Sequence, residues 1–382
     1  MRIVVDANVP AAEACFGQLG EVIRLPSRQI DAAALRDADA LVVRSITRVD
    51  EPLVEGARRL RFVGTCTIGT DHVDEQALAE RGIAFASAPG CNAEAVVDHV
   101  LGSLSTLGER QGWQLNERRV GIVGVGNVGG RLLGRLTAMG IDCLACDPPR
   151  AEAEGPEGFH DLASLIDECD VICLHTPLAR EGPHGTRHLL DAQRIADLAP
   201  GTVLLNAGRG DCVDGQALRQ RLAGQGDITA VLDVWEQEPA IDSALADLAE
   251  IATPHVAGYS LDGKLRGTHQ IYLALARHLD LPGRLTLDDL LPPPSVVSLA
   301  LGGGLAPEEA LRLCCRAVHD PRRDHDSLRR ESRRLGMAGG FDACRANYPR
   351  RREFATLDVT LRGAGAELEL LLKGAGFRVS LG

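Results

Sequence analysis

Short apolar runs alternate with longer segments of helical periodicity through the first two thirds of the chain. Four such runs precede residue 90, at residues 3–5, 40–43, 62–64 and 83–85. Runs this apolar, separated by spacers of helix length, are typical of parallel strands buried on both faces of a sheet. The first part of the chain is therefore predicted to be an α/β domain.

A long helix, predicted over about residues 93–110, leads into a second and stronger series of strands. The apolar runs of this series are residues 120–123, 143–146, 171–174, 203–206, 230–233 and 250–253. Six strands of this kind match a Rossmann sheet. A further helical pattern at about residues 260–278 has no strand after it, and we expect it to return the chain to the first domain.

The pattern changes near residue 290. The run Leu291-Pro292-Pro293-Pro294 cannot continue a helix or a central strand, and three glycines follow at residues 302–304. Beyond them the pattern predicts a short helix at about residues 307–319, a basic stretch, and a half-exposed strand at residues 357–361. A tail of under about a hundred residues buries little apolar surface alone. We expect it to complete its core against another chain or another domain.

Composition and charge narrow the class of protein. No stretch of the 382 residues approaches the roughly 20 consecutive apolar residues that a membrane helix needs, and the N-terminal residues lack a signal-peptide pattern. No membrane association and a cytoplasmic location are therefore predicted. The net charge of −12 opposes non-specific binding to nucleic acid, so no nucleic-acid partner is expected.

A glycine-rich turn follows the strand predicted at residues 120–123. Its sequence is Gly124-Val125-Gly126-Asn127-Val128-Gly129, and a helical pattern comes directly after it. Gly124 permits the tight turn, Gly126 lets a pyrophosphate approach the backbone, and Gly129 lets the helix pack closely on the strand. The N-terminus of the helix, at Asn127 and Val128, offers N–H groups to the phosphates. The sequence therefore predicts a dinucleotide site.

An acidic residue at the end of the next strand indicates which dinucleotide binds. The carboxylate of Asp147, about twenty residues after the glycine turn, can accept hydrogen bonds from the adenosine ribose and repel a 2′-phosphate. NAD is therefore predicted rather than NADP, with Arg150 close enough to weaken the discrimination. The other predicted cofactor contacts are Thr176, Ala207, Gly208, Asp233 and Gly258.

Three polar residues follow the last three strands of this series. They are Arg209 in residues 206–210, Glu238 in residues 233–239 and His255 in residues 253–258. The carboxyl ends of parallel strands are where open α/β sheets bind their ligands. Singly, each residue has a plain structural alternative as a helix cap, a turn or a loop. Together, beside a dinucleotide site, they favour catalysis.

The three residue types suit the oxidation of a 2-hydroxy acid. That reaction needs a base for the hydroxyl proton, a cation for the carboxylate, and a hydride acceptor held close. His255 is the candidate base, Glu238 would orient its ring and stabilise the imidazolium, and the planar fork of Arg209 suits a carboxylate.

These segments resemble the D-2-hydroxyacid dehydrogenase family. The resemblance implies catalytic roles for Arg209, Glu238 and His255, and an α/β fold in which a Rossmann NAD-binding domain is joined to a discontinuous flavodoxin-like substrate domain. It further implies a small α+β C-terminal dimerisation domain. The predicted divisions are residues 1–95 with 257–285 for the substrate domain, 96–256 for the NAD-binding domain and 286–382 for the dimerisation domain.

Other stretches resemble one branch of that family. They are residues 62–74, 88–93, 146–151 and 255–264, with 320–324 and 345–348 in the tail. The resemblance implies oxidation of 4-phospho-D-erythronate to (R)-3-hydroxy-2-oxo-4-phosphobutanoate in pyridoxal 5′-phosphate synthesis, and a homodimer formed through the tail. It also implies substrate contacts from Ser45, Thr67 and Tyr259.

A phosphorylated 2-hydroxy acid needs a second anion site, and Arg44 with Ser45 supplies a cation and a hydroxyl after the run at residues 40–43. Two alternatives stay open: another phosphorylated D-2-hydroxyacid dehydrogenase, such as one acting on 3-phosphoglycerate, and a non-catalytic NAD-sensing protein similar to a corepressor. No metal site is predicted, because glycines and a proline interrupt the only helix-like histidine spacing, at His184 and His188.

Overall fold

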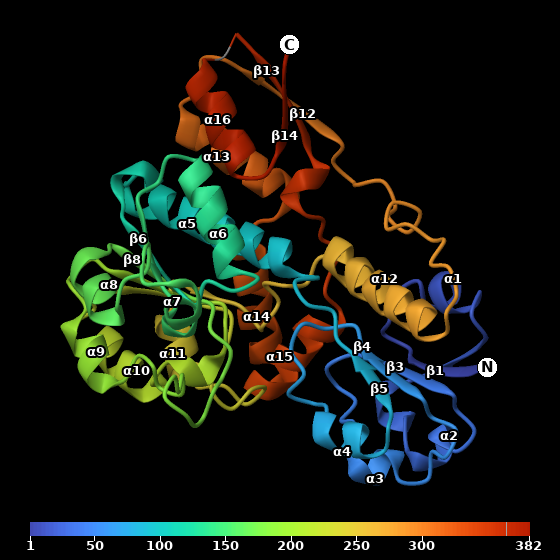
Figure 1. The fold of residues 1–382 in the computed structure, drawn as a ribbon. Coiled ribbons are helices and arrows are strands. Elements are labelled where there is room, and N and C mark those ends of the chain that lie inside the picture. The colour runs from blue at the N-terminus through green and yellow to red at the C-terminus, as the bar shows by residue number, and fades with distance from the viewer. Residues whose placement is uncertain (364) are drawn as a thin grey trace. The chain divides into compact units, whose positions relative to one another are not determined.

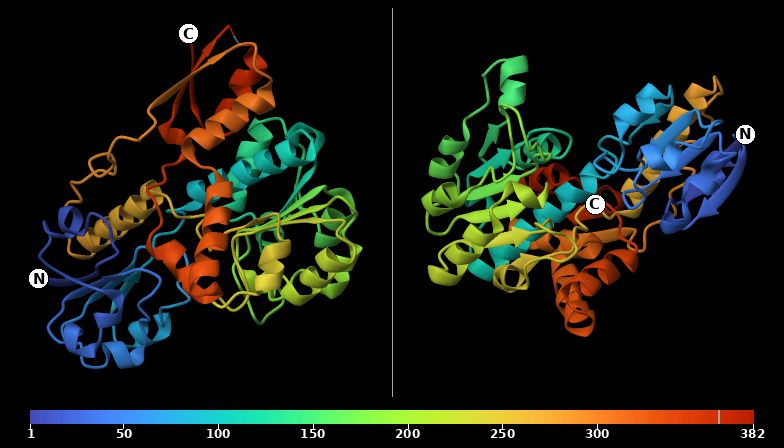
Figure 2. Two further views of the ribbon diagram at one scale, coloured as in Figure 1. Left: turned by 180° about the vertical axis from the view of Figure 1, so that it is seen from behind. Right: turned by 90° about the horizontal axis from the view of Figure 1, so that it is seen from below.

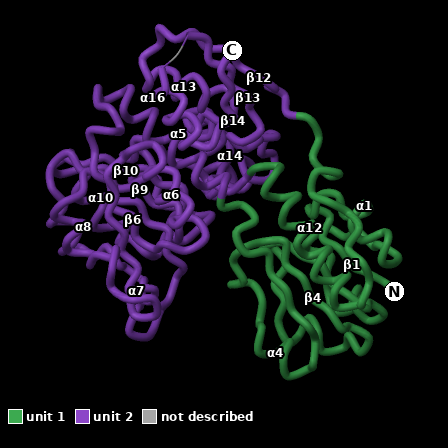
Figure 3. The backbone as a smooth tube through the Cα atoms, turned by 45° about the horizontal axis from the view of Figure 1, so that its top comes forward, with its two compact units in different colours: residues 1–93, 260–293 green, residues 94–259, 294–382 purple. Residues whose placement is uncertain are grey.

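The computed structural model describes residues 1–363 and 365–382, which form two compact units (Figure 3). Unit 1 comprises residues 1–93 and 260–293, and unit 2 comprises residues 94–259 and 294–382. Unit 1 is therefore discontinuous in sequence. The finer division of the chain into three domains stays a prediction.

Unit 1 contains a five-stranded parallel sheet in the order β2-β1-β3-β4-β5, which is the flavodoxin-like order. The strands are β1 (Arg2–Asp6), β2 (Glu21–Leu25), β3 (Ala40–Val43), β4 (Phe62–Thr65) and β5 (Ala84–Ala86). The sequence pattern missed β2. This strand lies at the edge of the sheet and none of its side chains is fully buried, so it lacks the continuous apolar run that marks its neighbours.

Helices cover both faces of this sheet (Figure 1). They are α1 (Ala12–Phe16), α2 (Ala32–Leu35), α3 (Glu51–Val54), α4 (Glu75–Glu80) and α12 (Leu261–His278). Ile3 of β1 belongs to the same buried cluster as Ile271 of α12, whereas Val4 belongs to a second cluster with Leu35 of α2. Helix α12 thus returns the chain to the first sheet, as its sequence predicted.

Unit 2 contains a six-stranded parallel sheet in the order β11-β10-β9-β8-β6-β7. The strands are β6 (Val120–Val123), β7 (Cys143–Cys146), β8 (Val171–Leu174), β9 (Val203–Asn206), β10 (Thr229–Leu232) and β11 (Ile251–Ala252). Strand β6 pairs with β7 on one side and with β8 on the other, so the strand order reverses at β6. Open α/β sheets bind their ligands at this switch point.

All six predicted strands are present, but their order differs from the Rossmann order: one strand instead of two follows β6 on the β7 side, and four instead of three lie on the β8 side. A segment after α7 follows β7 where the third strand would lie, and the backbone N–H of His160 donates to the carbonyl of Ala145 at 2.7 Å. The segment makes this contact without forming a strand. The omission leaves the switch point at β6 intact.

Helices precede or connect these strands and lie against the sheet (Figure 2). They are α5 (Ala93–Gln111), α6 (Gly129–Ala138), α7 (Pro148–Glu154), α8 (Leu162–Glu168), α9 (Ala192–Asp197), α10 (Gly215–Gly224) and α11 (Ser243–Leu248). Ile122 clusters with Leu132 of α6, and Ile172 clusters with Leu165 of α8, so both faces of the sheet are buried. No helix within the described ranges is long and apolar enough to cross a bilayer.

The C-terminal part of unit 2 adds a small sheet, β12-β13-β14, and four helices. These elements are β12 (Ser298–Gly302), α13 (Pro307–Val318), α14 (Pro321–Leu335), α15 (Met337–Ala346), β13 (Asp358–Arg362), α16 (Ala366–Gly374) and β14 (Arg378–Leu381). Leu311, Phe354 and Leu372 share one buried cluster with Leu132 and Leu136 of α6. The tail therefore shares its core with the six-stranded sheet of the same chain.

The basic stretch predicted after residue 319 forms two helices, α14 and α15. Arginines dominate α14, which buries only a narrow stripe that includes Leu328. This helix packs beside the end strand of the sheet, where the backbone N–H of Ala252 in β11 donates to Nδ1 of His325 at 2.9 Å. Edge strands are commonly covered in this way.

Three histidines lie in the interior of unit 2. Burial lowers the pKa of His99 and of His175 to about 4, and it lowers the pKa of His319 well below its usual range. Neither ring nitrogen of His175 has a hydrogen-bond partner in the part of the chain that the structure describes. These rings are therefore neutral near pH 7, and folding opposes their protonation.

We expect the His175→Leu variant to lose less stability in mild acid than the wild-type protein. Unfolded His175 binds a proton below a pH of about 6.5, whereas the folded ring binds one only near pH 4, so acid favours the unfolded state. Between pH 7 and pH 5 this difference amounts to about 2 kcal/mol of unfolding free energy. Urea unfolding of both proteins at the two pH values measures it.

The comparison with a variant is needed because burial raises the pKa of Asp98 and of Asp324 to about 6, which shifts stability in the opposite direction. Those carboxyl groups are present in both proteins. His160→Leu, at an exposed histidine, is the control and should behave as the wild type does. Equal acid losses in the wild type and in His175→Leu would show that His175 contributes nothing.

Candidate active site

The glycine turn joins β6 to α6 at the switch point of the sheet. Gly124 has a φ of +84°, and a Cβ there would lie 2.9 Å from the backbone nitrogen of Thr176. A Cβ at Gly129 would lie 1.9 Å from the carbonyl oxygen of Gly124. A Cβ at Gly126 would meet nothing within 4 Å. The fold itself thus requires two of these glycines, while the open space at the third suits the close approach of a pyrophosphate.

Asp147 and Arg150, at the start of α7 after the adjacent strand β7, hold this turn. Asp147 caps α7, and its Oδ2 accepts from the backbone N–H of Val125 at 2.8 Å. The Nη1 of Arg150 donates to the carbonyl oxygen of Val125 at 2.7 Å, and its other nitrogens pair with Glu154. Arg150 is therefore engaged inside the protein, which weakens the argument that it would attract a 2′-phosphate.

The predicted contacts beyond β8 and β9 lie beside the glycine turn. A Cβ at Gly208 would lie 3.0 Å from the carbonyl oxygen of Thr176, so the two strand-end loops touch. The hydroxyl of Thr176 donates to Sγ of Cys212 at 3.3 Å. Ala207 and Gly208 follow β9 directly, and Asn127 and Val128 directly precede α6.

Arg209, Glu238 and His255 follow β9, β10 and β11, which are neighbours in the sheet. The loop that carries Arg209 packs tightly on the next one, because a Cβ at Gly210 would lie 1.9 Å from the backbone carbon of Trp235. The requirement for glycine at residue 210 was not predicted from the sequence. The topology brings the three predicted catalytic residues to one edge of one sheet.

The side chains of Glu238 and His255 form a direct pair. Nδ1 of His255 and Oε2 of Glu238 are 2.7 Å apart, and Oε1 of Glu238 accepts from the backbone N–H of Trp235 at 2.9 Å. Since an ionised carboxylate only accepts hydrogen bonds, Nδ1 carries a proton and Nε2 of the neutral ring presents a lone pair. The His255 side chain is 36% exposed, so this nitrogen is available as a base.

A buried carboxylate lies beneath the loop that carries His255. Oδ1 of Asp233 accepts from Val256 N–H at 2.8 Å, and Oδ2 accepts from Ala257 N–H at 2.9 Å. Burial alone would raise the pKa of Asp233, but His99, His255 and the hydrogen bonds from Thr253 and Ala257 hold it below its usual range. Asp233 therefore stays ionised and fixes the loop, and its contact with a cofactor stays a prediction.

The C-terminal segment supplies two further residues of this site that sequence reasoning missed. Nη1 of Arg345 donates to the carbonyl oxygen of His255 at 3.1 Å, and Nη1 of Arg351 donates to that of Ala257 at 2.9 Å. Tyr259, at the end of the same loop after Gly258, lies 5.3 Å below the guanidinium of Arg345. Nothing in the local sequence links arginines about ninety residues away to this loop.

The other predicted substrate residues lie in unit 1. Arg44 and Ser45 follow β3, and Thr67 follows the neighbouring strand β4. Nη1 of Arg44 is buried without a hydrogen-bond partner in the described chain, whereas Ser45 is exposed. The hydroxyl of Thr67 donates to the carbonyl of Gly69 at 3.0 Å. The structure thus brings these three residues to one edge of the first sheet.

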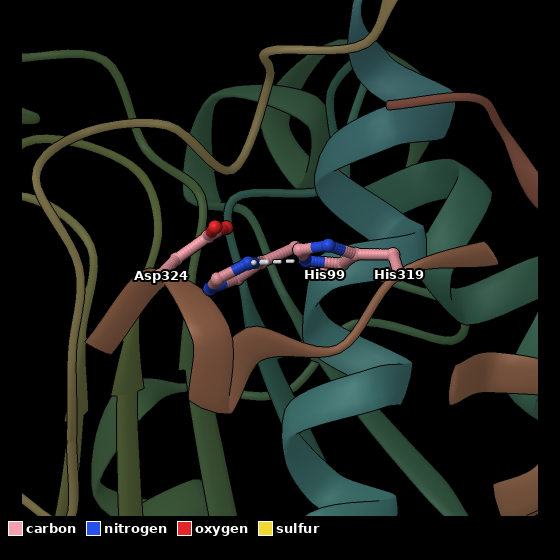
Figure 4. Close-up of side chains that lie close together, drawn as sticks. All are labelled: His99, His319 and Asp324. Carbon is pink, nitrogen blue, oxygen red and sulfur yellow. Dashed lines mark hydrogen bonds between the residues drawn. The ribbon is translucent and has the colours of Figure 1, made fainter. Parts of the chain in front are cut away.

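A buried cluster of two histidines and an aspartate was not anticipated (Figure 4). Nδ1 of His99 and Nε2 of His319 are 3.1 Å apart, and one potential ligand atom from each residue, with one from Asp324, lies within 4.8 Å of the others. Burial raises the pKa of Asp324 and lowers that of His319; the buried guanidinium of Arg351 opposes the first shift and adds to the second. This positive charge also opposes a divalent cation there. We assign no metal to the cluster.

His184 and His188, whose spacing was weighed as a metal site in the sequence, lie outside this cluster. His184 pairs with Glu152 and His188 pairs with Glu236, each at 2.9 Å.

Two family models match the chain. Residues 96–257 match the D-isomer specific 2-hydroxyacid dehydrogenase NAD binding domain, and residues 290–373 match a domain of unknown function (DUF3410). The first match identifies the six-stranded sheet and its helices as an NAD-binding domain. The sequence prediction of NAD as the cofactor is thereby confirmed.

The chain is similar to curated proteins along its whole length. It is 58% identical to erythronate-4-phosphate dehydrogenase of Chromohalobacter salexigens, over 100% of this chain and 99% of that protein. It is 54% identical to the enzyme of the same name from Azotobacter vinelandii, over 98% and 99%. A crystal structure of NAD⁺-bound 3-phosphoglycerate dehydrogenase from Entamoeba histolytica matches with a TM-score of 0.63 and 21% identity, over 76% of this chain and 98% of that one. The last likeness confirms the fold, and the first two show that the chain belongs to the erythronate-4-phosphate dehydrogenase family.

Proposed function

We propose that this protein catalyses the NAD-dependent oxidation of 4-phospho-D-erythronate to (R)-3-hydroxy-2-oxo-4-phosphobutanoate, a step in pyridoxal 5′-phosphate synthesis. The observation that carries the proposal is the 2.7 Å pair of His255 and Glu238 at strand ends next to that of Arg209. The names of relatives 58% and 54% identical to the chain support the choice of substrate.

In this mechanism Nε2 of His255 removes the proton of the C2 hydroxyl, and the carbonyl forms at C2 as the C–H bond breaks. When held at the glycine turn of residues 124–129, NAD would supply the acceptor for the hydride that leaves C2. Glu238 stabilises the imidazolium that forms, because its carboxylate hydrogen-bonds Nδ1. Arg209 binds the substrate carboxylate and polarises the developing carbonyl.

Residues around the switch point are proposed to hold NAD. The open space at Gly126 and the start of α6 at Asn127 and Val128 suit the pyrophosphate. Asp147 has lone pairs left for the ribose hydroxyls, since each carboxylate oxygen accepts one backbone N–H, from Val125 and from Arg150. The remaining proposed contacts are Gly124, Gly129, Thr176, Ala207, Gly208, Asp233 and Gly258.

Arg44, Ser45, Thr67 and Tyr259 are proposed to bind the phosphorylated substrate. The buried Nη1 of Arg44, which has no hydrogen-bond partner in the described residues, supports an anion at this position. A buried donor normally has an acceptor, and a phosphate oxygen would supply one.

A homodimer formed through residues 286–382, in the cytoplasm, completes the proposal. The small parallel sheet of the tail leaves Ala300 and Ser380 exposed on the face opposite Leu301 and Val359. Since parallel sheets are usually covered on both faces, a second copy of the chain is the proposed cover.

Replacing His255 with alanine should lower the rate of hydride transfer by about two to four orders of magnitude, because the proposed acceptor of the hydroxyl proton is removed. NAD should still bind, since the glycine turn is unchanged. Single-turnover absorbance of NADH measures the first effect, and calorimetric titration with NAD measures the second. Normal turnover by His255→Ala would refute the assignment of the base.

Asp147→Ser should reduce the preference for NAD over NADP by about tenfold or more, because the repulsion of a 2′-phosphate disappears while a capping hydroxyl remains. The ratio of kcat/KM values for the two cofactors measures this preference. Glu152→Gln, on the same helix, is the control and should leave the ratio unchanged. An unaltered ratio in Asp147→Ser would remove Asp147 from cofactor selection.

In a panel of 4-phospho-D-erythronate, 3-phosphoglycerate and D-lactate, we expect the highest kcat/KM for the first. The Arg44→Met variant should raise KM for the phosphorylated acids by about tenfold or more, since a charge-assisted hydrogen bond is lost, and leave D-lactate unaffected. Arg48→Met, at an exposed arginine of the same loop, is the control. Preference for 3-phosphoglycerate would favour the first alternative, and NAD binding without turnover of any substrate would favour a sensor.

A further inference from the structure

We infer that Arg345 and Arg351 are positioning residues that hold the catalytic loop, residues 255–259, and that the C-terminal segment thereby takes part in hydride transfer without touching substrate. The inference rests on the proposed role of His255 as the base. Both arginines lie within residues 290–373, outside the matched NAD-binding domain at residues 96–257.

The catalytic loop needs to be held because its backbone is strained. His255 has a φ of +56°, in the left-handed region that side chains other than glycine rarely adopt. Such a conformation persists where the surrounding structure fixes it. The N–H groups of the loop are fixed by Asp233, whose carbonyl accepts from His255 at 2.7 Å and whose carboxylate accepts from Val256 and Ala257.

The two arginines fix the same loop from the carbonyl side. Arg345 donates to the oxygen of His255 at 3.1 Å, and Arg351 donates to that of Ala257 at 2.9 Å. Hydrogen bonds from a charged donor are stronger than those between neutral groups. The loop therefore bonds to the Asp233 carboxylate on its N–H side and to two guanidinium groups on its carbonyl side.

Arg351 links the loop to the rest of unit 2. Its side chain is among the largest that are fully buried, and its Nη2 donates to the carbonyl of Ala95 in α5. The nearby carboxyl of Asp324, which accepts from the hydroxyl of Tyr348 at 2.7 Å, offsets the buried charge. The ring of Tyr348 in turn packs edge-on against Tyr259, with centroids 5.5 Å apart.

Arg345 acts at the two ends of the loop. It donates to His255 at the start, and its guanidinium lies over the ring of Tyr259 at the end, 5.3 Å from the centroid. Loss of this arginine removes the carbonyl-side partner of the peptide after His255 and leaves the bond from Val256 N–H to Asp233, so a partial rotation of that peptide would displace the imidazole from Glu238. Displacement of a reacting group by about 1 Å can cost a hundredfold in rate.

Arg345→Met tests the inference best, because Arg345 is half-buried and methionine keeps much of its packing. We expect kcat to fall about 10- to 100-fold, with KM for substrate and the Kd for NAD within about threefold of the wild-type values. Arg345→Lys, which keeps a charged donor, should restore part of the loss. Arg350→Met, at an exposed neighbour of Arg351, is the control and should behave as the wild type does.

A double-mutant cycle with His255→Ala separates positioning from general damage. If Arg345 acts through His255, adding Arg345→Met to His255→Ala should leave the residual single-turnover rate unchanged. A further fall of similar size in that background, or a wild-type kcat in Arg345→Met alone, would overturn the inference. Normal activity of His255→Ala alone would instead refute the proposed base, so the two failures are distinguishable.

Arg351→Met provides a second test, of the hydrogen bond to the carbonyl of Ala257. Thermal unfolding reports its effect on the fold, and the same cycle reports its effect on the loop. Where the variant unfolds at the assay temperature, Arg351→Lys replaces it, since lysine retains the buried charge and one donor. A kcat loss that persists undiminished in the His255→Ala background would contradict a positioning role for Arg351.

Discussion

The ionised carboxylate of Asp233 is the feature on which the catalytic edge of unit 2 depends. A buried carboxylate must be compensated by hydrogen bonds and nearby positive charge, or it would protonate. Here the compensation comes from Thr253, Val256 and Ala257, so the carboxylate gathers β10, β11 and the loop after β11 around one point. The position of His255 follows from this arrangement, because His255, with its φ of +56°, lies between Thr253 and Val256, which Asp233 holds.

Close contacts also fix the glycine turn, which lies toward the other end of the strand order, after β6. Gly124 and Gly129 are required by close contacts within the protein, and only Gly126 faces open space. Asp147 ties this turn to β7 through Val125, so one carboxylate both shapes the turn and remains available to a ribose. The glycine turn and the catalytic pair are therefore positioned by strand ends of one sheet, whose spacing the backbone hydrogen bonds fix.

Sequence reasoning succeeded where the physical requirement is local. The glycine turn, the acidic residue after the next strand, and Arg209, Glu238 and His255 at strand ends can all be recognised within short segments, and the structure places them at one sheet edge as expected. Strand β2 was missed because an edge strand needs no continuous apolar run. Helix α14 was missed because its charged side chains outnumber its buried ones.

Arg345 and Arg351 were missed for a different reason. Their partners are backbone carbonyls, which every residue has, so no pattern of side chains at the catalytic loop indicates that arginines are needed there. Their function depends on where α14 and α15 bring the chain, and this is a property of the tertiary fold. NAD could be predicted from the sequence, whereas the hydrogen bonds of Arg345 and Arg351 to the loop could not.

Buried charge explains how a tail with few large apolar groups can hold a catalytic loop. Asp98 pairs with Arg135 and accepts from Phe354 N–H at 2.8 Å, and Arg351 reaches both α5 and the loop. Each of these groups is costly to bury alone, so removing one partner leaves the other buried without compensation. The apolar contacts shared by Phe354 and α6 would tolerate small shifts, but these directional bonds would not. The tail is therefore held in one register with α5, and the carbonyls of the catalytic loop are held by the same set of bonds.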